Sequence, residues 1–240
     1  MMESEFRIDY LADFLRLVDK FDYFDKLVLF RGQNIKGNLL PSIARNDHSF
    51  DTTEIEMCML DELRRVGGAY LNGHETDWEL MVLAQHHGMK TRLLDWTSNP
   101  LVALWFACED FKNIEDSYVY MLSASKHMMD MSASPFKIKE TKILSPRHNN
   151  PRISAQSGYF SAHRFSKRFN TFVPLDKNLE MKESLFHFVV NGEAKKSILK
   201  GLNKLGINHH TVYPGLEGMC KGLTFEMYEN RPVEFIKKNI

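Results

Sequence analysis

The segment between residues 85 and 106 concentrates side chains that can bind a ligand or transfer a proton. Two apolar, periodic stretches flank it, and the connection between them holds Gln85, His86, Lys90, Thr91, Arg92, Asp95 and Thr97. Because binding and catalytic residues often lie on loops held by rigid elements, this connection is a candidate site. Alternatively, the groups brace the loop, with Asp95 paired to Arg92 or capping the next helix. Trp96 or Trp105 could offer an aromatic face to a flat heterocycle.

A second candidate follows the apolar run that ends at Phe30. Arg31 would stand at the end of a strand, with Gly32 beside it and Gln33 next in the chain. Glycine lets backbone approach a ligand closely, and the planar guanidinium donors fit a phosphate or a carboxylate. The alternative is a structural arginine paired with an acidic loop residue.

Two further positions could contribute to a site. Residues 153–160 are predicted to form a strand that Gly158 interrupts, and a period of two places Arg152 and Gln156 on one face. That face either lines a pocket or is a solvated edge. Glu217 lies in a glycine-flanked turn, where it could be a catalytic carboxylate or a charge that favours a helix start.

The paired histidines do not predict a metal site. Neighbouring helical residues such as His86 and His87 point about 100° apart, and no third ligand follows at a recognisable spacing. Residues 207–212 are expected to be extended, which would send the rings of His209 and His210 to opposite faces. We therefore expect no metal, although His86 could act as an acid, a base or a ribose-binding group.

The composition limits the classes of partner. The 240 residues carry 31 basic and 31 acidic side chains, so any contact with a polyanion must come from a local patch. No apolar segment of membrane-spanning length occurs, and the first ten residues lack the apolar core of a secretion signal, so we expect a cytoplasmic protein without a membrane partner. The three cysteines, Cys58, Cys108 and Cys220, are expected to be reduced and buried.

Hydrophobic periodicity indicates the elements that must position these groups. It predicts helices over residues 9–20, 54–71, 77–87, about 98–111 and 192–205, and a last helix that follows the turn at 214–218 and ends at 227. It predicts strands over 26–30, 117–122, 153–160, 170–174 and 184–190, whereas 125–150 and 175–183 look like linkers or long loops. Helices and strands do not alternate regularly. We therefore expect an α+β fold with a mixed central sheet and flanking helices, as a single domain over residues 1–240.

Several motifs together resemble the FRG domain family, over about residues 25 to 225. They are Phe30-Arg31-Gly32-Gln33, Ala84-Gln85-His86-His87-Gly88, Thr91 to Thr97, Pro100 to Ala107, Arg152 to Phe160, Gly206-Ile207 and Tyr213-Pro214-Gly215-Leu216-Glu217-Gly218. In the last motif the family more often shows Phe-Pro-Asp-Leu-Asp-Gly, and Glu217 keeps the carboxylate. The resemblance implies a prokaryotic protein of the kind linked with phage defence or toxins.

The order of these motifs is also similar to that of ADP-ribosyltransferases. This second resemblance implies an ADP-ribosyltransferase-like fold that uses NAD as a substrate. The residues it implies for binding NAD are Arg31, Gly32, Gln33, His86, Thr91, Arg92, Trp96, Thr97 and Arg152. Those it implies for catalysis are Arg31, Asp95, Gln156 and Glu217. Gln156 stands where these enzymes usually place Glu, so Asp95 or Glu217 would have to stabilise an oxocarbenium-like transition state. A second possible constellation consists of Arg31, His86, Arg92 and Arg152.

Two functional hypotheses follow. The first is an effector that uses NAD to modify a nucleic acid or a protein, in phage defence or a toxin system with an antitoxin or another defence protein as partner. The second is a module that recognises a nucleotide or a phage ligand without turnover. A nuclease lacks an evident set of metal-binding carboxylates. Both hypotheses require that residues 31, 92–97 and 152–156 converge on one polar hollow.

Overall fold

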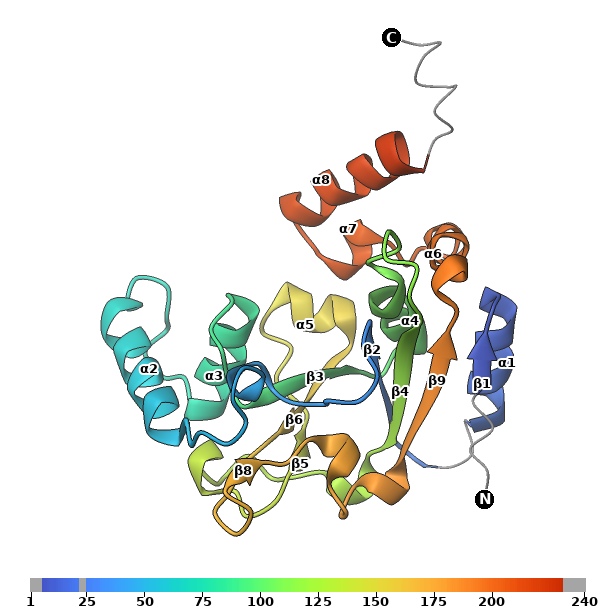
Figure 1. The fold of residues 1–240 in the computed structure, drawn as a ribbon. Helices are drawn as coiled ribbons and strands as arrows, with labels where there is room; N and C mark the ends of the chain where they lie inside the picture. Colours follow the sequence, from blue (N-terminus) through green and yellow to red (C-terminus); the bar gives the residue numbers. More distant parts are fainter. Residues whose placement is uncertain (1–5, 22–24, 231–240) are drawn as a thin grey trace.

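The computed structural model describes residues 6–21 and 25–230, which form an α+β fold around a seven-stranded mixed sheet (Figure 1). The strand order is β1-β9-β4-β2-β3-β6-β5. The strands are β1 (Phe6–Ile8), β2 (Val28–Gln33), β3 (Leu93–Thr97), β4 (Ser117–Ser123), β5 (Lys142–Leu144), β6 (Gly158–Ala162) and β9 (Leu185–Val190). Only β1 and β9 pair in parallel within this sheet; the other neighbouring strands are antiparallel. The predicted α+β class with a mixed sheet and flanking helices is confirmed.

Helices lie against the sheet and beyond one of its ends (Figure 1). They are α1 (Leu11–Phe21), α2 (Thr53–Val66), α3 (Asp77–His86), α4 (Pro100–Cys108), α5 (Pro151–Gln156), α6 (Lys195–Lys204), α7 (His209–Val212) and α8 (Leu216–Thr224). A π-helical turn, Phe225–Glu229, continues α8. A separate two-stranded hairpin consists of β7 (Phe165–Ser166) and β8 (Thr171–Phe172). None of the helices in the described part of the chain is long and apolar enough to cross a membrane.

Helix α4 packs tightly against the centre of the sheet. Asn99 caps it, because its side chain accepts from the amide of Leu101, and Pro100 occupies the first helical position. Its apolar side chains join those of α1, α6, β4 and β9 in the largest core cluster. Gly32 of β2 makes this close packing possible, because a Cβ atom there would lie 1.9 Å from the carbonyl oxygen of Ala103.

Strands β2 and β3 separate after a single registered pair. Phe30 pairs with Thr97, whereas β2 and β4 pair over six residues and β3 and β6 over five. Beyond Phe30 the two central strands diverge, as Figure 1 shows. Beyond this pair, side chains rather than a continuous ladder of main-chain hydrogen bonds therefore line the space between β2 and β3.

Several sequence predictions about local structure were wrong. The segment after Gly88 contains strand β3 rather than only a loop, and β1 and β5 were not predicted. Residues 151–156 form a helix, which Ser157 ends in a left-handed conformation before β6 begins at Gly158. His209 and His210 lie in the short helix α7 and not in an extended segment. Cys108 is buried as expected, but Cys58 and Cys220 are exposed.

Candidate functional site

A cavity of about 320 Å³ opens where β2 and β3 diverge. Residues from four regions that are distant in the chain line it. They are Phe30, Arg31, Gly32, Arg45, Gln85, His86, Asp95, Trp96, Thr97, Phe106, Arg152, Gln156 and Tyr213. The expected convergence of residue 31 with parts of segments 92–97 and 152–156 is therefore present. Gln33, Thr91, Arg92 and Glu217 do not line this cavity.

Arg31 spans the gap between the two diverging strands. Its Nη1 donates to the main-chain oxygen of Asp95 at 2.8 Å, and its Nε donates to Oε1 of Gln33 at 3.3 Å. The side chain is 14% exposed and its Nη1 lies 4.0 Å from Oδ2 of Asp95. Burial lowers the pKa of Arg31 to about 10, although the negative charge of Asp95 opposes this shift. The guanidinium therefore remains charged at neutral pH and faces the cavity.

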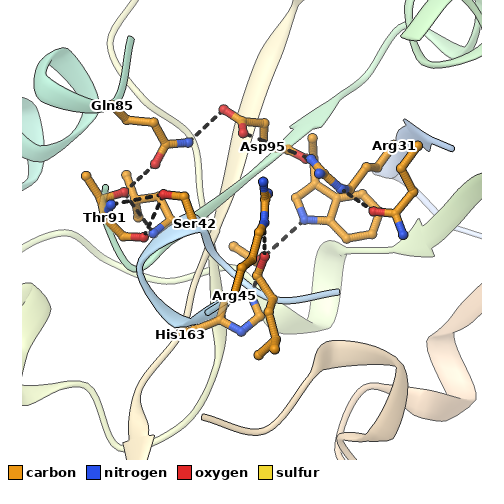
Figure 2. Close-up of polar contacts among 12 residues, drawn as sticks. Arg31, Ser42, Arg45, Gln85, Thr91, Asp95 and His163 are labelled. Atoms are coloured by element: carbon orange, nitrogen blue, oxygen red, sulfur yellow. Dashed lines mark hydrogen bonds and ion pairs between the residues drawn. The ribbon is translucent and has the colours of Figure 1, made fainter. Parts of the chain in front are cut away.

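Asp95 is held in place by a chain of polar contacts (Figure 2). The side-chain nitrogen Nε2 of Gln85 donates to Oδ1 of Asp95 at 2.8 Å, and the hydroxyl of Thr91 donates to Oε1 of Gln85. The main-chain nitrogen of Thr91 in turn donates to the hydroxyl of Ser42 at 3.1 Å. Among the described residues, Asp95 contributes the one carboxylate that lines the cavity. Gln85, Thr91 and Ser42 therefore act on the cavity by positioning Asp95.

Two further arginines make the cavity positive. Arg45 follows the short 3₁₀ turn Ser42–Ala44, and its Nε donates to the carbonyl of Leu40 at 3.2 Å. The Nη1 of Arg152 donates to the carbonyl of His86 at 3.1 Å. Within residues 6–21 and 25–230, neither arginine forms an ion pair with a carboxylate. Three guanidinium groups against one carboxylate make this cavity suited to an anionic ligand.

Aromatic rings and His86 form the remaining wall. The guanidinium carbon of Arg152 lies 4.7 Å from the ring centre of Tyr213, whose ring also meets Phe106 edge-on at 6.1 Å. Burial lowers the pKa of His86, and the positive charge of Arg152 adds to this effect while Asp95 opposes it. The Nε2 atom of His86 is buried without a hydrogen-bond partner. A neutral imidazole with a free nitrogen can donate to a ligand or accept from it.

Arg92 is structural, contrary to the prediction that it binds a ligand. It is 1% exposed, and its Nε donates to Oε2 of Glu56 at 2.6 Å. Its main-chain nitrogen donates to the other oxygen of Glu56 at 2.6 Å, and its guanidinium carbon lies 4.7 Å from the ring centre of Phe136. This buried ion pair fastens α2 to the beginning of β3. The adjacent Thr91 is also buried and serves the positioning chain of Asp95.

The remaining predicted residues occupy other roles. The amide nitrogen of Gln33 donates to the carbonyls of Ile35 and Gly37, and Gln33 lies outside the cavity lining. Glu217 is exposed on α8 and pairs with Lys221 at 2.8 Å, which lowers the pKa of the carboxyl group. Glu217 is therefore not the carboxylate of this cavity.

The polar side chains of Gln156, Thr97 and Trp96 form hydrogen bonds within the protein. Gln156 lines the cavity, but its amide nitrogen donates to the carbonyl of Val212 at 3.1 Å. The hydroxyl of Thr97 donates to the carbonyl of Gln156 at 2.6 Å. Trp96 is 3% exposed, and its Nε1 donates to the hydroxyl of Ser161 at 3.0 Å. Trp105 belongs to the core and does not line the cavity.

Sequence reasoning missed Arg45, Phe106 and Tyr213. Arg45 follows a stretch without clear periodicity, so its only signal was a basic side chain between two predicted elements. Phe106 lies in an apolar helical pattern that favours a place in the core. Tyr213 lies in the motif of Glu217, and only the glutamate of that motif was predicted to be catalytic. Among the described residues, no group of three histidine, cysteine, aspartate or glutamate side chains is placed to hold a metal ion.

The fold and the cavity define an α+β protein with a positively charged pocket between two diverging central strands. The FRG domain model matches residues 26–116 of the chain. The matched range carries ten of the thirteen lining residues; Arg152, Gln156 and Tyr213 lie outside it. No curated protein and no solved structure gave a significant match to the chain.

Proposed function

We propose that the cavity binds NAD and that the protein is an ADP-ribosyltransferase-like enzyme with Asp95 as its catalytic carboxylate. One observation carries the proposal: a single, positioned carboxylate faces three arginines in one cavity. This combination supplies both charges that the reaction requires, since the substrate carries phosphates and the reacting ribose becomes positive.

The binding part of the proposal rests on charge and shape. Arg31, Arg45 and Arg152 would hold the phosphates, because guanidinium groups form paired, charge-assisted hydrogen bonds with phosphate oxygens. Tyr213 and Phe106 offer ring surface for a base or for the nicotinamide. The volume of about 320 Å³ is at the lower end of the range for ligand pockets, about 300–1,000 Å³. The cavity would therefore enclose part of NAD and leave the rest at its mouth.

The chemical part rests on Asp95. The bond between nicotinamide and C1′ of the ribose breaks, and nicotinamide leaves with the electron pair, which neutralises its ring nitrogen. The positive charge that develops on the ribose is stabilised by a nearby carboxylate, as in glycoside hydrolysis. A nucleophilic oxygen or nitrogen of the acceptor then bonds to C1′, and its proton passes to the free Nε2 of His86 or to water. Gln85 would keep Asp95 oriented throughout.

The resemblance to the FRG family suggests the setting. We infer an effector in phage defence or in a toxin system, with a nucleic acid or a protein as acceptor and an antitoxin or another defence protein as partner. The match over residues 26–116 supports membership in this family and leaves the setting as a proposal.

Nicotinamide release from NAD tests the enzyme. Asp95→Asn keeps the shape of the side chain and removes its charge, so we expect release to fall about 100- to 1,000-fold while NAD binding changes little. Glu217→Gln is the matched control, because it removes an exposed carboxylate outside the cavity and should leave release unchanged. Equal release by the parent protein and Asp95→Asn would exclude Asp95 as the catalytic group.

A second candidate is a recognition module that binds a nucleotide without turnover. The side chain of Asp95 is 54% exposed, so water solvates the carboxylate and weakens its effect on a developing positive charge. In this case calorimetry would show saturable binding of NAD or ADP that Arg152→Gln weakens, and no nicotinamide would be released. Transfer of labelled ADP-ribose to any acceptor would exclude this candidate.

A further inference from the structure

The charges of the chain are unevenly distributed along the sequence. Residues 141–175 contain no aspartate or glutamate, whereas they contain Lys142, Arg147, Arg152, Arg164, Lys167 and Arg168. The rest of the chain then has 25 basic residues against 31 acidic ones. A protein without net charge thus has one strongly basic segment, which supplies Arg152 to the cavity and three cations to the β7–β8 hairpin.

The hairpin presents its tip to solvent on a rigid base. Phe172 of β8 is fully buried and meets Phe165 of β7 edge-on, with ring centres 5.5 Å apart. The amide of Phe169 donates to the carbonyl of Ser166 at 3.2 Å, and Asn170 adopts the left-handed conformation that often ends such a turn. The tip is therefore an ordered turn that carries Lys167, Arg168 and Phe169.

The cations of the hairpin lack acidic partners. Lys142 pairs with Glu140 and Arg147 pairs with Glu79, but within the described part of the chain Arg164, Lys167 and Arg168 form no ion pair. Their charges are available to a ligand.

The loop whose His48 carbonyl accepts from the amide of Phe172 carries two acidic residues, Asp47 and Asp51, and both are hydrogen-bonded to residues close by in the chain. His48 of this loop contacts the hairpin, and Asp47 beside it accepts from the amide of Ser49 at 2.9 Å and from its hydroxyl at 2.6 Å. Asp51 accepts from the amide of Thr53 at 3.1 Å. Both carboxylates accept from neutral donors close by in the chain, and within the described part of the chain neither forms an ion pair with a cation of the hairpin.

Phe169 places an exposed aromatic ring beside the cations of the hairpin. Its side chain is 62% exposed, and the guanidinium carbon of Arg168 lies 5.2 Å from its ring centre. An exposed ring among unpaired cations fits a nucleic acid strand, because a base can stack on the ring while phosphates contact the cations. A membrane surface would instead require several apolar side chains at the tip.

We propose that the β7–β8 hairpin binds single-stranded nucleic acid through Lys167, Arg168 and Phe169. The hairpin adjoins the loop that carries Arg45 into the cavity, since the amide of Phe172 donates to the carbonyl of His48 at 2.7 Å. In the proposed complex the bound strand runs from the hairpin along this loop to the cavity, whose lining includes Arg45. This would make the nucleic acid the acceptor of the proposed transferase. The acceptor role rests on the proposed function, whereas the binding itself does not.

Fluorescence anisotropy with a labelled oligouridylate of about 16 nucleotides, without NAD, tests the binding. The double variant Lys167→Gln/Arg168→Gln should bind at least tenfold more weakly, and the slope of log K against log salt should become shallower by about 1.4, about 0.7 for each lost phosphate contact. Phe169→Leu should weaken binding about 5- to 100-fold through lost stacking. The matched control is Lys200→Gln/Lys204→Gln on α6, an equal charge change far from β8 in Figure 1, which should leave affinity unchanged.

The proposal is overturned if the hairpin variants bind the oligonucleotide like the parent protein, or if the α6 variant loses as much affinity. Binding to phosphatidylserine vesicles that depends on the hairpin, without oligonucleotide binding, would also overturn it. Nicotinamide release separates this proposal from the function of the cavity: without nucleic acid, the hairpin variants should release nicotinamide like the parent protein, whereas Asp95→Asn should keep oligonucleotide binding.

Discussion

Replacement of His163 by asparagine should remove much of the protein's loss of stability in acid. His163 is 1% exposed and does not line the cavity, and its Nε2 lies 3.0 Å from the hydroxyl of Ser161. Burial, together with the positive charges of Arg31 and Arg92, lowers the pKa of His163 to about 3. In the unfolded chain the same group has a pKa of about 6.5. The folded protein therefore binds this proton much more weakly than the unfolded chain does.

The sign and size of the effect follow from this difference. Because the folded pKa is the lower one, the stability that neutral His163 supplies is complete above about pH 6.5 and declines as the pH falls toward 3. Each pH unit in this window costs about 1.4 kcal/mol. Between pH 7.5 and pH 5 the free energy of unfolding should fall by about 2 kcal/mol through His163 alone.

Urea unfolding followed by tryptophan fluorescence at pH 7.5, 6.5, 5.8 and 5.0 would measure this decline. The readout is the slope against pH, since His163→Asn also changes the contact with Ser161 and so shifts stability at every pH. His74→Asn, at an exposed position before α3, serves as the control and should keep the parent slope. If His163→Asn and the parent protein lose stability in parallel, the histidine does not have the depressed pKa that its burial implies.

Three further outcomes are expected. Glu56→Gln should lower the free energy of unfolding by about 3–5 kcal/mol because it leaves Arg92 buried without its partner, whereas Glu62→Gln, in an exposed pair on the same helix, should leave the melting temperature unchanged. Gly32→Ala should destabilise the protein by about 3 kcal/mol in the same urea assay, since its Cβ would overlap backbone atoms of α4; Gly68→Ala has open space and should be neutral. A thiol reagent at pH 8 should modify Cys58 and Cys220 in the native protein but not Cys108, whose pKa burial raises to about 12; modification of all three would contradict this.

The long, strongly periodic elements could be predicted from the sequence. The helix that ends before Gly88 was expected because glycine favours the left-handed conformation that follows a helix, and Gly88 has a φ of 91°. The helix opened by Asn99 and Pro100 was expected from its cap and its proline. Short elements escaped prediction. Strand β3 spans only five residues, four of them buried, and its exposed central residue, Asp95, is of a type that favours a loop in the sequence.

Residues 151–156 show how a local pattern can mislead. A polar–apolar alternation favoured a strand, but Asn150 caps the segment as a helix through the amide of Arg152, and Pro151 suits the first helical position. Ser157 then turns the chain into β6. As a result Arg152 reaches the cavity from a helix, and Gln156 turns toward Val212. Arg152 and Gln156 were thus identified as cavity residues, whereas the directions of their side chains were not predicted.

The role of Arg92 depended on a partner that sequence spacing cannot indicate. Glu56 lies 36 residues earlier on α2, and only the folded chain brings its carboxylate to Arg92. Arg31 and Arg92 look equivalent in the sequence, since each is a basic residue beside an apolar run. The structure distinguishes them by what surrounds the guanidinium: Arg92 forms a buried ion pair with Glu56, whereas Arg31 faces a cavity.

The FRG match alone does not contain a complete site. Residues 26–116 carry β2 and β3, but the outer neighbours of these strands, β4 and β6, lie outside the matched range. Thr97 is held by the carbonyl of Gln156, and the cavity is closed on one side by Arg152 and Tyr213. The matched segment therefore brings the carboxylate and two of the three arginines, and the following half of the chain supplies the third arginine and the supporting strands. Any activity of the cavity should accordingly be sought in the whole chain rather than in the matched segment alone.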